Sequence, residues 1–327
     1  MATFVRTQSV SHPIGERGRL ALRVTTGDVR VKAAPGGEAS VQATFEIAAA
    51  SDEEADRVFE EIKLHVEAGD GELSVEERDG VSGLGSAISR LFRGRGRIQL
   101  KVEAQLPPMA ELRLEGVTAD VQAEGLRGEQ RYATVSGDLY LTDLGGALRI
   151  NSVSGDVTLR ASEPIDLRVE AVSGDLSAIT PRLDALRASS VSGDIEVEAA
   201  LGAGEFGVET VSGDLTVGLL GGASFRVRGL STDIHSDLDH RIEGHRDRRR
   251  VTVGAGGPEF SFSSMSGDLA IRRPRRLDVA SQPTAVADAQ AANSGRSQED
   301  QLAVLRALEA GEIDVDEATR RLGRTDA

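Results

Sequence analysis

The chain has 327 residues and a formal net charge of −15 at pH 7, with 39% hydrophobic residues, 3% aromatic residues and no cysteine. The absence of cysteine excludes disulfide bonds, thiolate metal sites and cysteine nucleophiles. The negative charge argues against broad binding of nucleic acids or anionic surfaces by the whole molecule.

The first 20 residues contain Arg6, His12, Pro13, Glu16 and Arg17 but no apolar run. They therefore predict neither a signal peptide nor a membrane anchor. We accordingly expect a cytoplasmic protein, with the inner membrane face as a place of peripheral contact.

Residues 1–110 predict a β-rich segment with one helix, continuous with the repeats that follow. A strand, the turn Thr26–Asp28 and a second strand occupy residues 19–31. Ser51 and Glu54 form a capping box ahead of apolar residues at helical spacing. We expect this segment to cover the open edge of the first repeat. Further strands are expected around residues 64–66, 73–75 and 98–102.

Residues 81–97 form an insertion with an apolar side and a group of arginines. As a helix it would suit a membrane surface or a partner protein, because the apolar face enters a headgroup layer while arginine meets anionic lipid. The simpler interpretation, which we favour, is a loop helix that lies on the repeats. The candidate contact residues are Leu84, Ile88, Leu91, Phe92, Arg93, Arg95 and Arg97.

A five-residue phrase, Val-Ser-Gly-Asp followed by an aliphatic residue, recurs through the middle of the chain. Weaker copies begin at Val117 and Leu230, and a last clear copy begins at Met265. Self-similarity at such a period marks stacked repeats in which each unit covers its neighbour's hydrophobic face. The five best copies begin at Val135, Val153, Val172, Val191 and Val211, which lie 18, 19, 19 and 20 residues apart.

Each unit predicts a strand, a turn and a strand, because apolar and polar residues alternate on both sides of the phrase. A small residue such as Thr134 or Ser152 precedes the phrase, where the chain bends. One coil offers about five aliphatic side chains worth roughly 1.5–3 kcal/mol each, whereas ordering costs about 1–2 kcal/mol per residue. Stability must therefore come from contacts between coils. Over residues 111–277 we predict an all-β fold, a single-stranded β-solenoid of about seven coils.

The gap between Leu230 and Met265 predicts an extended turn or a projecting hairpin. His235, His240 and His245 recur there near acidic residues, a combination that can ligate metals. A spacing of five places neither three ligands on one strand face nor two on one helix face. We therefore favour a solvated turn over a metal site.

Residues 278–297 predict a flexible linker, because they are rich in Ala, Gln, Ser and Asp and show no periodicity. Residues 298–323 then predict a helical hairpin with two capping signals. Such a hairpin is too small to bury a core alone, so we expect it to oligomerise or to dock. Its candidate contact residues are Leu302, Leu305, Leu308 and Leu322.

The repeated Gly-Asp pairs predict a row of carboxylates along one edge of the stack. Carboxylates about 4.8 Å apart repel by roughly 1 kcal/mol per neighbour in water, which would favour a row of bound cations. We favour a structural role, in which each Asp accepts N–H and hydroxyl bonds within its own turn. Catalytic carboxylates are the least favoured alternative, because these residues are all equivalent. The pairs are Gly137–Asp138, Gly155–Asp156, Gly174–Asp175, Gly193–Asp194, Gly213–Asp214 and Gly267–Asp268.

Other enzyme motifs are missing from the sequence. It contains no phosphate loop, no Gly-x-Ser-x-Gly elbow, no His-Glu-x-x-His and no dinucleotide fingerprint. We therefore expect no catalytic residues, no cofactor, no small-molecule substrate and no nucleic-acid partner.

At the repeated phrase, the chain resembles the bacterial β-strand-repeat family of unknown function labelled "putative adhesin", over roughly residues 4–272. The tail from Leu302 to Ala318 is similar to the short helical hairpins called SHOCT or SHOCT-like. The resemblance implies oligomerisation or tethering by the tail and a link to cell-envelope stress responses. It implies no catalytic residues.

Three hypotheses follow for the function. The first is a non-enzymatic scaffold that presents its sheet faces to a protein partner or to the inner membrane surface. The second is a surface adhesin or glycan-binding solenoid. The third is a carbohydrate-active enzyme on a β-helix, which would need a cleft with non-equivalent carboxylates.

Overall fold

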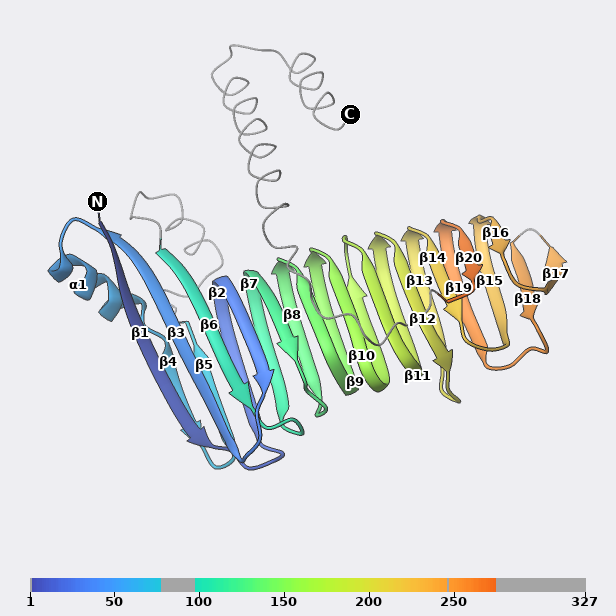
Figure 1. Ribbon diagram of the computed structural model, residues 1–327. Coiled ribbons are helices and arrows are strands. Elements are labelled where there is room, and N and C mark those ends of the chain that lie inside the picture. The colour runs from blue at the N-terminus through green and yellow to red at the C-terminus, as the bar shows by residue number, and fades with distance from the viewer. Residues whose placement is uncertain (1, 78–97, 246, 275–327) are drawn as a thin grey trace, which may run out of the picture. The chain divides into compact units, whose positions relative to one another are not determined.

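A computed structural model describes residues 2–77, 98–245 and 247–274 of the chain (Figure 1). The described residues are predominantly β, with one α-helix and an open 20-stranded sheet. None of their helices is long and apolar enough to cross a membrane. The helix is α1 (Asp52–Ile62), and the strands are β1 (Ala2–Pro13), β2 (Arg19–Ala33), β3 (Glu38–Ala49), β4 (His65–Gly69), β5 (Glu72–Glu76), β6 (Ile98–Leu106), β7 (Glu111–Glu124), β8 (Gln130–Ser136), β9 (Leu139–Ser154), β10 (Val157–Ala171), β11 (Leu176–Ser192), β12 (Ile195–Leu201), β13 (Phe206–Ser212), β14 (Leu215–Leu219), β15 (Ala223–Ser231), β16 (Ile234–Ser236), β17 (His240–His245), β18 (Arg248–Val253), β19 (Glu259–Ser266) and β20 (Leu269–Arg272).

The chain divides into two units, Met1–Arg275 and Arg276–Ala327. The second unit, with the linker and hairpin expected at 278–323, lies outside the described residues. The contacts proposed for Leu302, Leu305, Leu308 and Leu322 therefore stay predictions.

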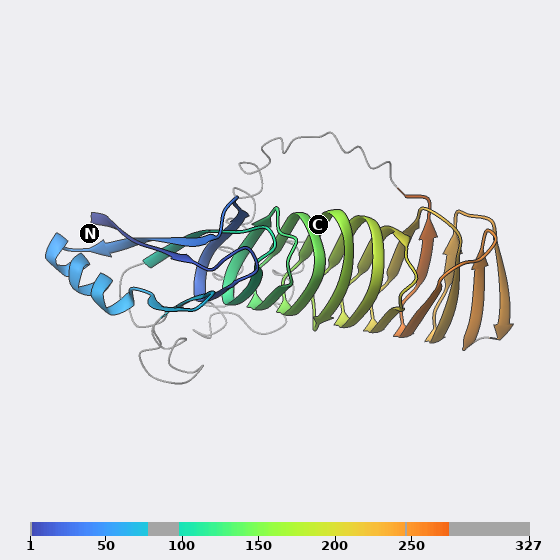
Figure 2. The same ribbon diagram turned by 90° about the horizontal axis from the view of Figure 1, so that it is seen from below.

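The repeats stack as parallel coils, which confirms the solenoid-like architecture (Figure 2). Each coil has a segment before its Gly-Asp turn and a segment after it, and we call these the first and second layers. Strand β9 contributes to both layers: Leu139–Thr142 pairs with β7 in the second, and Leu148–Ser154 pairs with β8 in the first. Each predicted unit of strand, turn and strand therefore forms one coil of the solenoid.

The core lies between the two layers and is mainly aliphatic, with buried aromatic side chains such as Tyr132, Phe225 and Phe260. Leu139 and Leu141 of the second layer face Leu148 and Ile150 of the first, and all four are at most 2% exposed. The small polar residues that precede the turns also point inward, as expected from their position at the bend. The buried members of this set are Thr134, Ser152, Ser190, Thr210 and Ser264.

The coils do not stack in sequence order, contrary to the simple expectation. The coil of β19 and β20 lies between β13–β14 and β15–β16, because β19 pairs in parallel with both β13 and β15. Phe260 of β19 stacks on Phe206 at 6.1 Å and on Phe225 at 5.3 Å between ring centroids. The copy that begins at Met265 is therefore the penultimate coil of the stack, although it is the last in sequence.

The segment expected to cover the first coil does so through β2. This strand pairs in parallel with β7 over its whole length and places Asp28 beside Asp120. The capping box also forms at the start of α1: the Ser51 hydroxyl accepts the N–H of Glu54 at 3.2 Å, and the Glu54 carboxylate accepts the N–H of Ala50 at 2.9 Å. Strand β1 was not expected, and it pairs antiparallel with β3.

The hairpin expected between Leu230 and Met265 is present, but it continues the sheet instead of projecting from it. Strands β17 and β18 pair antiparallel, and β18 pairs antiparallel with β15. The backbone of β15 can use this second partner because β15 is the end of the parallel stack. The hairpin therefore closes one end of the first layer.

Candidate functional site

The Gly-Asp turns gather on one edge of the stack, as the repeat predicts. Each Asp carboxylate in the series except the last accepts the backbone N–H of the Asp in the next coil, at 2.7–3.0 Å. The backbone carbonyl of each later Asp accepts an N–H from the preceding coil, as between Asp156 and Leu139 at 2.9 Å. These bonds correct the expectation of bonding within one turn, because the partner belongs to the neighbouring coil. In stacking order the series is Asp120, Asp138, Asp156, Asp175, Asp194, Asp214, Asp268 and Asp233.

The glycine of the turn is required by close packing between coils. Gly155 has a φ of 117°, and a Cβ at this position would lie 2.3 Å from the carbonyl oxygen of Gly137. Gly137, Gly174 and Gly193 also have positive φ values, and each would make the same kind of contact with the preceding coil. Hydrogen bonds and close packing between neighbouring coils thus give both the Asp and the Gly of each turn a structural role.

In the described part of the chain, no three His, Asp or Glu side chains come together as a metal site. His235 lies on the short edge strand β16, whereas His240 and His245 lie at the two ends of β17. The structure thus does not bring the three histidines together.

A second polar cluster lies at the opposite bend of the coils, around Arg127. The guanidinium donates to the carboxylates of Asp143 at 2.8 Å and Glu163 at 2.7 Å, so it links three coils. Asp143 has a φ of 52°, the only positive φ of a non-glycine residue among those described. The Ser162 hydroxyl, together with Arg127, holds the pKa of Asp143 below its usual value against an opposing effect of partial burial.

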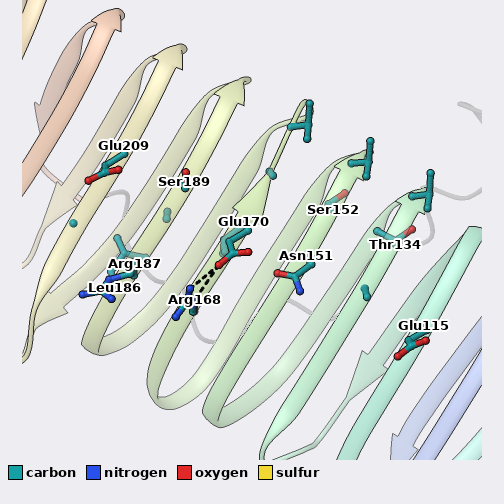
Figure 3. A pocket seen from close by; sticks show the side chains of 18 of the residues that line it. Glu115, Thr134, Asn151, Ser152, Arg168, Glu170, Leu186, Arg187, Ser189 and Glu209 are labelled. Atoms are coloured by element: carbon teal, nitrogen blue, oxygen red, sulfur yellow. Dashed lines mark hydrogen bonds and ion pairs between the residues drawn. The ribbon is translucent and has the colours of Figure 1, made fainter.

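An open groove of about 1,520 Å³ follows the outer face of the first layer across successive coils (Figure 3). A smaller depression of about 250 Å³ includes Arg149 and shares Arg168 and Arg187 with the groove. Because strands of the first layer run parallel and in register, equivalent outward residues form rows along the stack. Two of these rows determine the charge and the polarity of the surface.

The first row is cationic, and we call it the arginine row. Neighbouring strands pair its members directly, so five guanidinium groups follow one another about 4.8 Å apart at the backbone. The members are Arg113, Arg131, Arg149, Arg168 and Arg187.

The second row is apolar, and we call it the valine row. It consists of the first residue of each phrase, which lies outside the core with 43–49% of its surface exposed. Met265 and Leu230 extend the row over the last coils, at 57% and 81% exposed. Monomeric proteins rarely expose such a continuous apolar stripe unless it is used for contact. The members are Val135, Val153, Val172, Val191 and Val211.

Four members of the arginine row have acidic partners of their own. Their ion-pair distances are 2.7 Å for Arg113–Glu115, Arg131–Glu129 and Arg168–Glu170, and 3.1 Å for Arg187–Glu205. Figure 3 shows the Arg168 pair beside the short side chains of Asn151 and Ser189.

Arg149, at the centre of the row, is different. Its outward neighbours along β9 are Ala147 and Asn151, and within the described ranges no carboxylate lies at ion-pair distance from it. Among the described residues, Arg149 is therefore a guanidinium without an acidic partner between two other arginines.

Neither row was recognised from the sequence as a functional surface. The phrase itself contains the valines, but the repeat alone does not say that its first residue points outward. The arginines recur at intervals of 18 and 19 residues, which is a signal that comparison of the coils in register could have found. The candidates Leu84, Ile88, Leu91, Phe92, Arg93, Arg95 and Arg97 lie outside the described residues.

Several solved structures are similar to this chain at low sequence identity. A "putative lipid binding protein" from Parabacteroides distasonis ATCC 8503 is 15% identical with a TM-score of 0.44, and the match covers 82% of this chain and 97% of that one. A "putative adhesin" from the same organism is 12% identical with a TM-score of 0.39, at the same coverage. A "putative adhesin" from Bacteroides fragilis NCTC 9343 is 14% identical with a TM-score of 0.35, covering 81% and 97%.

No curated protein matches the chain. A family model described as Toastrack DUF4097, by contrast, matches residues 13–272, which include the whole stack of coils. The protein therefore belongs to the Toastrack DUF4097 family.

Proposed function

We propose that the protein is a non-enzymatic interaction protein whose groove binds an acidic, amphipathic segment of a protein partner. The observation that carries this proposal is the exposed valine row beside the arginine row. An apolar stripe next to a cationic stripe complements a segment with aliphatic residues on one side and carboxylates on its flank.

The spacing of the two rows supports a helical segment. Arg149 and Val153 are four residues apart on β9, which corresponds to about 13 Å along a strand. A helix with its side chains is about 10–12 Å across. A helix that lies along the stack, over Ala133 and Asn151, would therefore touch both rows at once.

Arg149 supports an external carboxylate as the anionic group. An exposed ion pair is worth roughly 0–1 kcal/mol, so the paired arginines can exchange partners at little cost. Arg149 needs no exchange, because no carboxylate in the described part of the chain is paired with it. An acidic residue of the partner would complete the row at its centre.

A flat anionic membrane is the less suitable partner for this face. The arginine row is interleaved with Glu115, Glu129, Glu170 and Glu205, and the chain as a whole carries a net charge of −15. A lipid headgroup layer would meet these carboxylates together with the arginines. The groove also receives a narrow segment more readily than a plane.

The non-enzymatic part of the proposal is supported by the equivalence of the coils. Each candidate carboxylate occupies the same position in its turn and accepts the same kind of N–H bond. Glycoside hydrolysis by two carboxylates needs a pair in different surroundings. In the proposed role, residues 298–323 contribute self-association or docking, and the resemblance of the tail suggests cell-envelope stress as the context.

A binding experiment with a defined probe tests the proposal. The probe is a helix-stapled peptide of about 15 residues, a length chosen because shorter isolated helices are marginal in water. It carries a leucine stripe flanked by glutamates, and a second peptide carries lysines in place of the glutamates. Fluorescence anisotropy should show saturable binding of the acidic peptide to the full chain and at least about tenfold weaker binding of the basic one.

Matched variants on one strand locate the binding. Val153→Ser changes the groove and Arg149→Glu changes the adjoining depression, whereas Thr142→Glu changes the second layer of the same strand β9. The first two variants should weaken binding about tenfold or more and Thr142→Glu should leave it unchanged. Equal affinity for both peptides, or equal loss in all three variants, would refute the groove as the site. Binding to anionic vesicles that disappears in Arg149→Glu would assign the groove to a membrane instead.

A further inference from the structure

The coil of β19 and β20, which we call the inserted coil, is held between two coils that precede it in sequence. Asp268 donates its N–H to Asp214 at 2.8 Å on one side, and Asp233 donates its N–H to Asp268 at 2.7 Å on the other. The inserted coil is also the last described part of the chain before residues 275–327.

The coil of β15 and β16 carries the same features as the inserted coil. Phe225 and Phe260 occupy the same register position, as do Ile234 and Leu269 in the second layer. Both coils also present an Asp N–H to a carboxylate of the preceding coil. Either coil can therefore supply the groups that β13 and β14 require from a neighbour.

The sequence spacing fits direct stacking of β15–β16 on β13–β14. Asp233 follows Asp214 by 19 residues, and directly stacked coils elsewhere in the ladder are 18, 19 or 20 residues apart. Asp268 follows Asp214 by 54 residues. The inserted coil is thus the exception to the spacing of the repeat.

The connections that would have to rearrange are rich in glycine. Gly221 and Gly222 join β14 to β15, and Gly254, Gly256 and Gly257 join β18 to β19. The last three all have positive φ values, which other residues rarely adopt. A shift of β15 by one strand spacing can be absorbed in these two connections.

We propose that the inserted coil is exchangeable: when it leaves the stack, β15 and β16 move by one strand spacing and pair directly with β13 and β14. The exchange releases residues 259–274 together with the chain that follows them. It also removes Met265 from the extension of the valine row and places Leu230 beside Val211. A pull on the C-terminal part of the chain would thereby change one end of the groove, which goes beyond the binding role proposed above.

Three exposed serines give a direct test, because the native chain contains no cysteine. Ser212 pairs with Ser266, and Ser266 pairs with Ser231, on three adjacent strands. Ser212 and Ser231 are thus two strand spacings apart, about 9.6 Å, which exceeds the roughly 7 Å that a disulfide can bridge. After the exchange they would be direct neighbours.

The full chain with Ser212→Cys and Ser231→Cys is oxidised mildly under native conditions, and the bridge is followed by non-reducing electrophoresis and mass spectrometry. The matched control is Thr118→Cys with Ser154→Cys, which also spans two strand spacings, across Ser136, but lies in coils that stay in the stack. Ser212→Cys with Ser266→Cys is the positive control for direct neighbours.

We expect the Ser212/Ser231 pair to bridge at least about tenfold faster than the Thr118/Ser154 pair, because only the former is brought together by a local opening. Phe260→Ala should raise the first rate and leave the second unchanged. Equal rates of the two pairs would indicate general unfolding and overturn the proposal. Failure of the Ser212/Ser231 pair to bridge, while the Ser212/Ser266 pair goes to completion, would overturn it as well.

Discussion

The backbone N–H of Asp268 donates to the carboxylate of Asp214 at 2.8 Å, although 54 residues separate them in the sequence. The same bond joins Asp175 to Asp156 and Asp194 to Asp175 in coils that are consecutive in sequence. The hydrogen bond between neighbouring coils therefore involves only their two turns, and it does not require the two coils to be consecutive in the sequence. This property of the turn underlies both the order of the stack and the exchange proposed for its end.

The ladder requires an acceptor oxygen in each turn, and it does not require the negative charge. Asp175→Asn retains an oxygen for the N–H of Asp194, and it removes a repulsion of roughly 1 kcal/mol per neighbouring carboxylate in water. Asp175→Ala removes the acceptor and should cost about 0.5–1.5 kcal/mol. Equilibrium urea unfolding should give a free energy for the Asn variant equal to or above that of the native chain, with the Ala variant lowest. If the Asn variant were as unstable as the Ala variant, a bound cation would be needed to explain the row.

The turn glycines are required by contact between coils as well as by their φ. Gly155→Ala and Gly36→Ala are a matched pair, because their φ values are 117° and 116°. A Cβ at Gly155 would lie 2.3 Å from the oxygen of Gly137, whereas a Cβ at Gly36 would meet nothing within 4 Å. Both variants should lose about 1–2 kcal/mol from backbone strain, and Gly155→Ala should lose clearly more. Thermal unfolding measures the difference, and equal melting temperatures would remove the steric part of this explanation.

Asp143 should make the stability of the fold depend on pH in the acid range. Its pKa is lowered in the folded state by the Ser162 hydroxyl and Arg127. Because the pKa of Asp143 is lower in the folded chain, its ionised carboxylate stabilises the fold at pH values above its pKa in the unfolded chain, about 3.9. This stabilisation is lost as the pH falls through the pKa of Asp143 in the folded chain. Asp143→Asn keeps a residue that tolerates positive φ but removes this titration.

The measurement is urea unfolding of the native chain and of Asp143→Asn at pH 7 and at pH 3. The native chain should be the more stable of the two at pH 7, and the difference should shrink at pH 3. Arg127→Gln is the companion variant, because it removes the cation that joins Asp143 to Glu163. A difference that stays constant between the two pH values would show that Asp143 acts through its backbone conformation alone.

Much of the fold follows from local sequence patterns. The recurring phrase predicts the turns, the alternation predicts which residues enter the core, and Ser51 with Glu54 predicts the start of α1. These features depend on residues that are close together in the chain, so their physical causes can be recognised within a short window. Strand β1 lacks such a sequence pattern, because its less exposed positions include the polar residues Arg6, Gln8 and His12.

The order of the coils and the groove could not be predicted in the same way. Asp233 and Asp268 both suit the place beside Asp214, so the repeat cannot say which coil occupies it. The arginine row can be recognised only after Arg131, Arg149 and Arg168 are placed in register on neighbouring strands. Surface rows of a solenoid are properties of the stack, and a single coil does not reveal them.

The groove as a binding surface for a protein segment is tested most directly by site-specific photo-cross-linking. A photoreactive amino acid replaces Asn151 in the groove or, as the matched control, Thr142 in the second layer of β9, and the full chain is irradiated in its native cells. We predict a protein adduct at position 151 that is absent at position 142 and disappears when Arg149→Glu is added. The same adduct at both positions, or an adduct at position 151 that contains lipid or glycan but no protein, would contradict it.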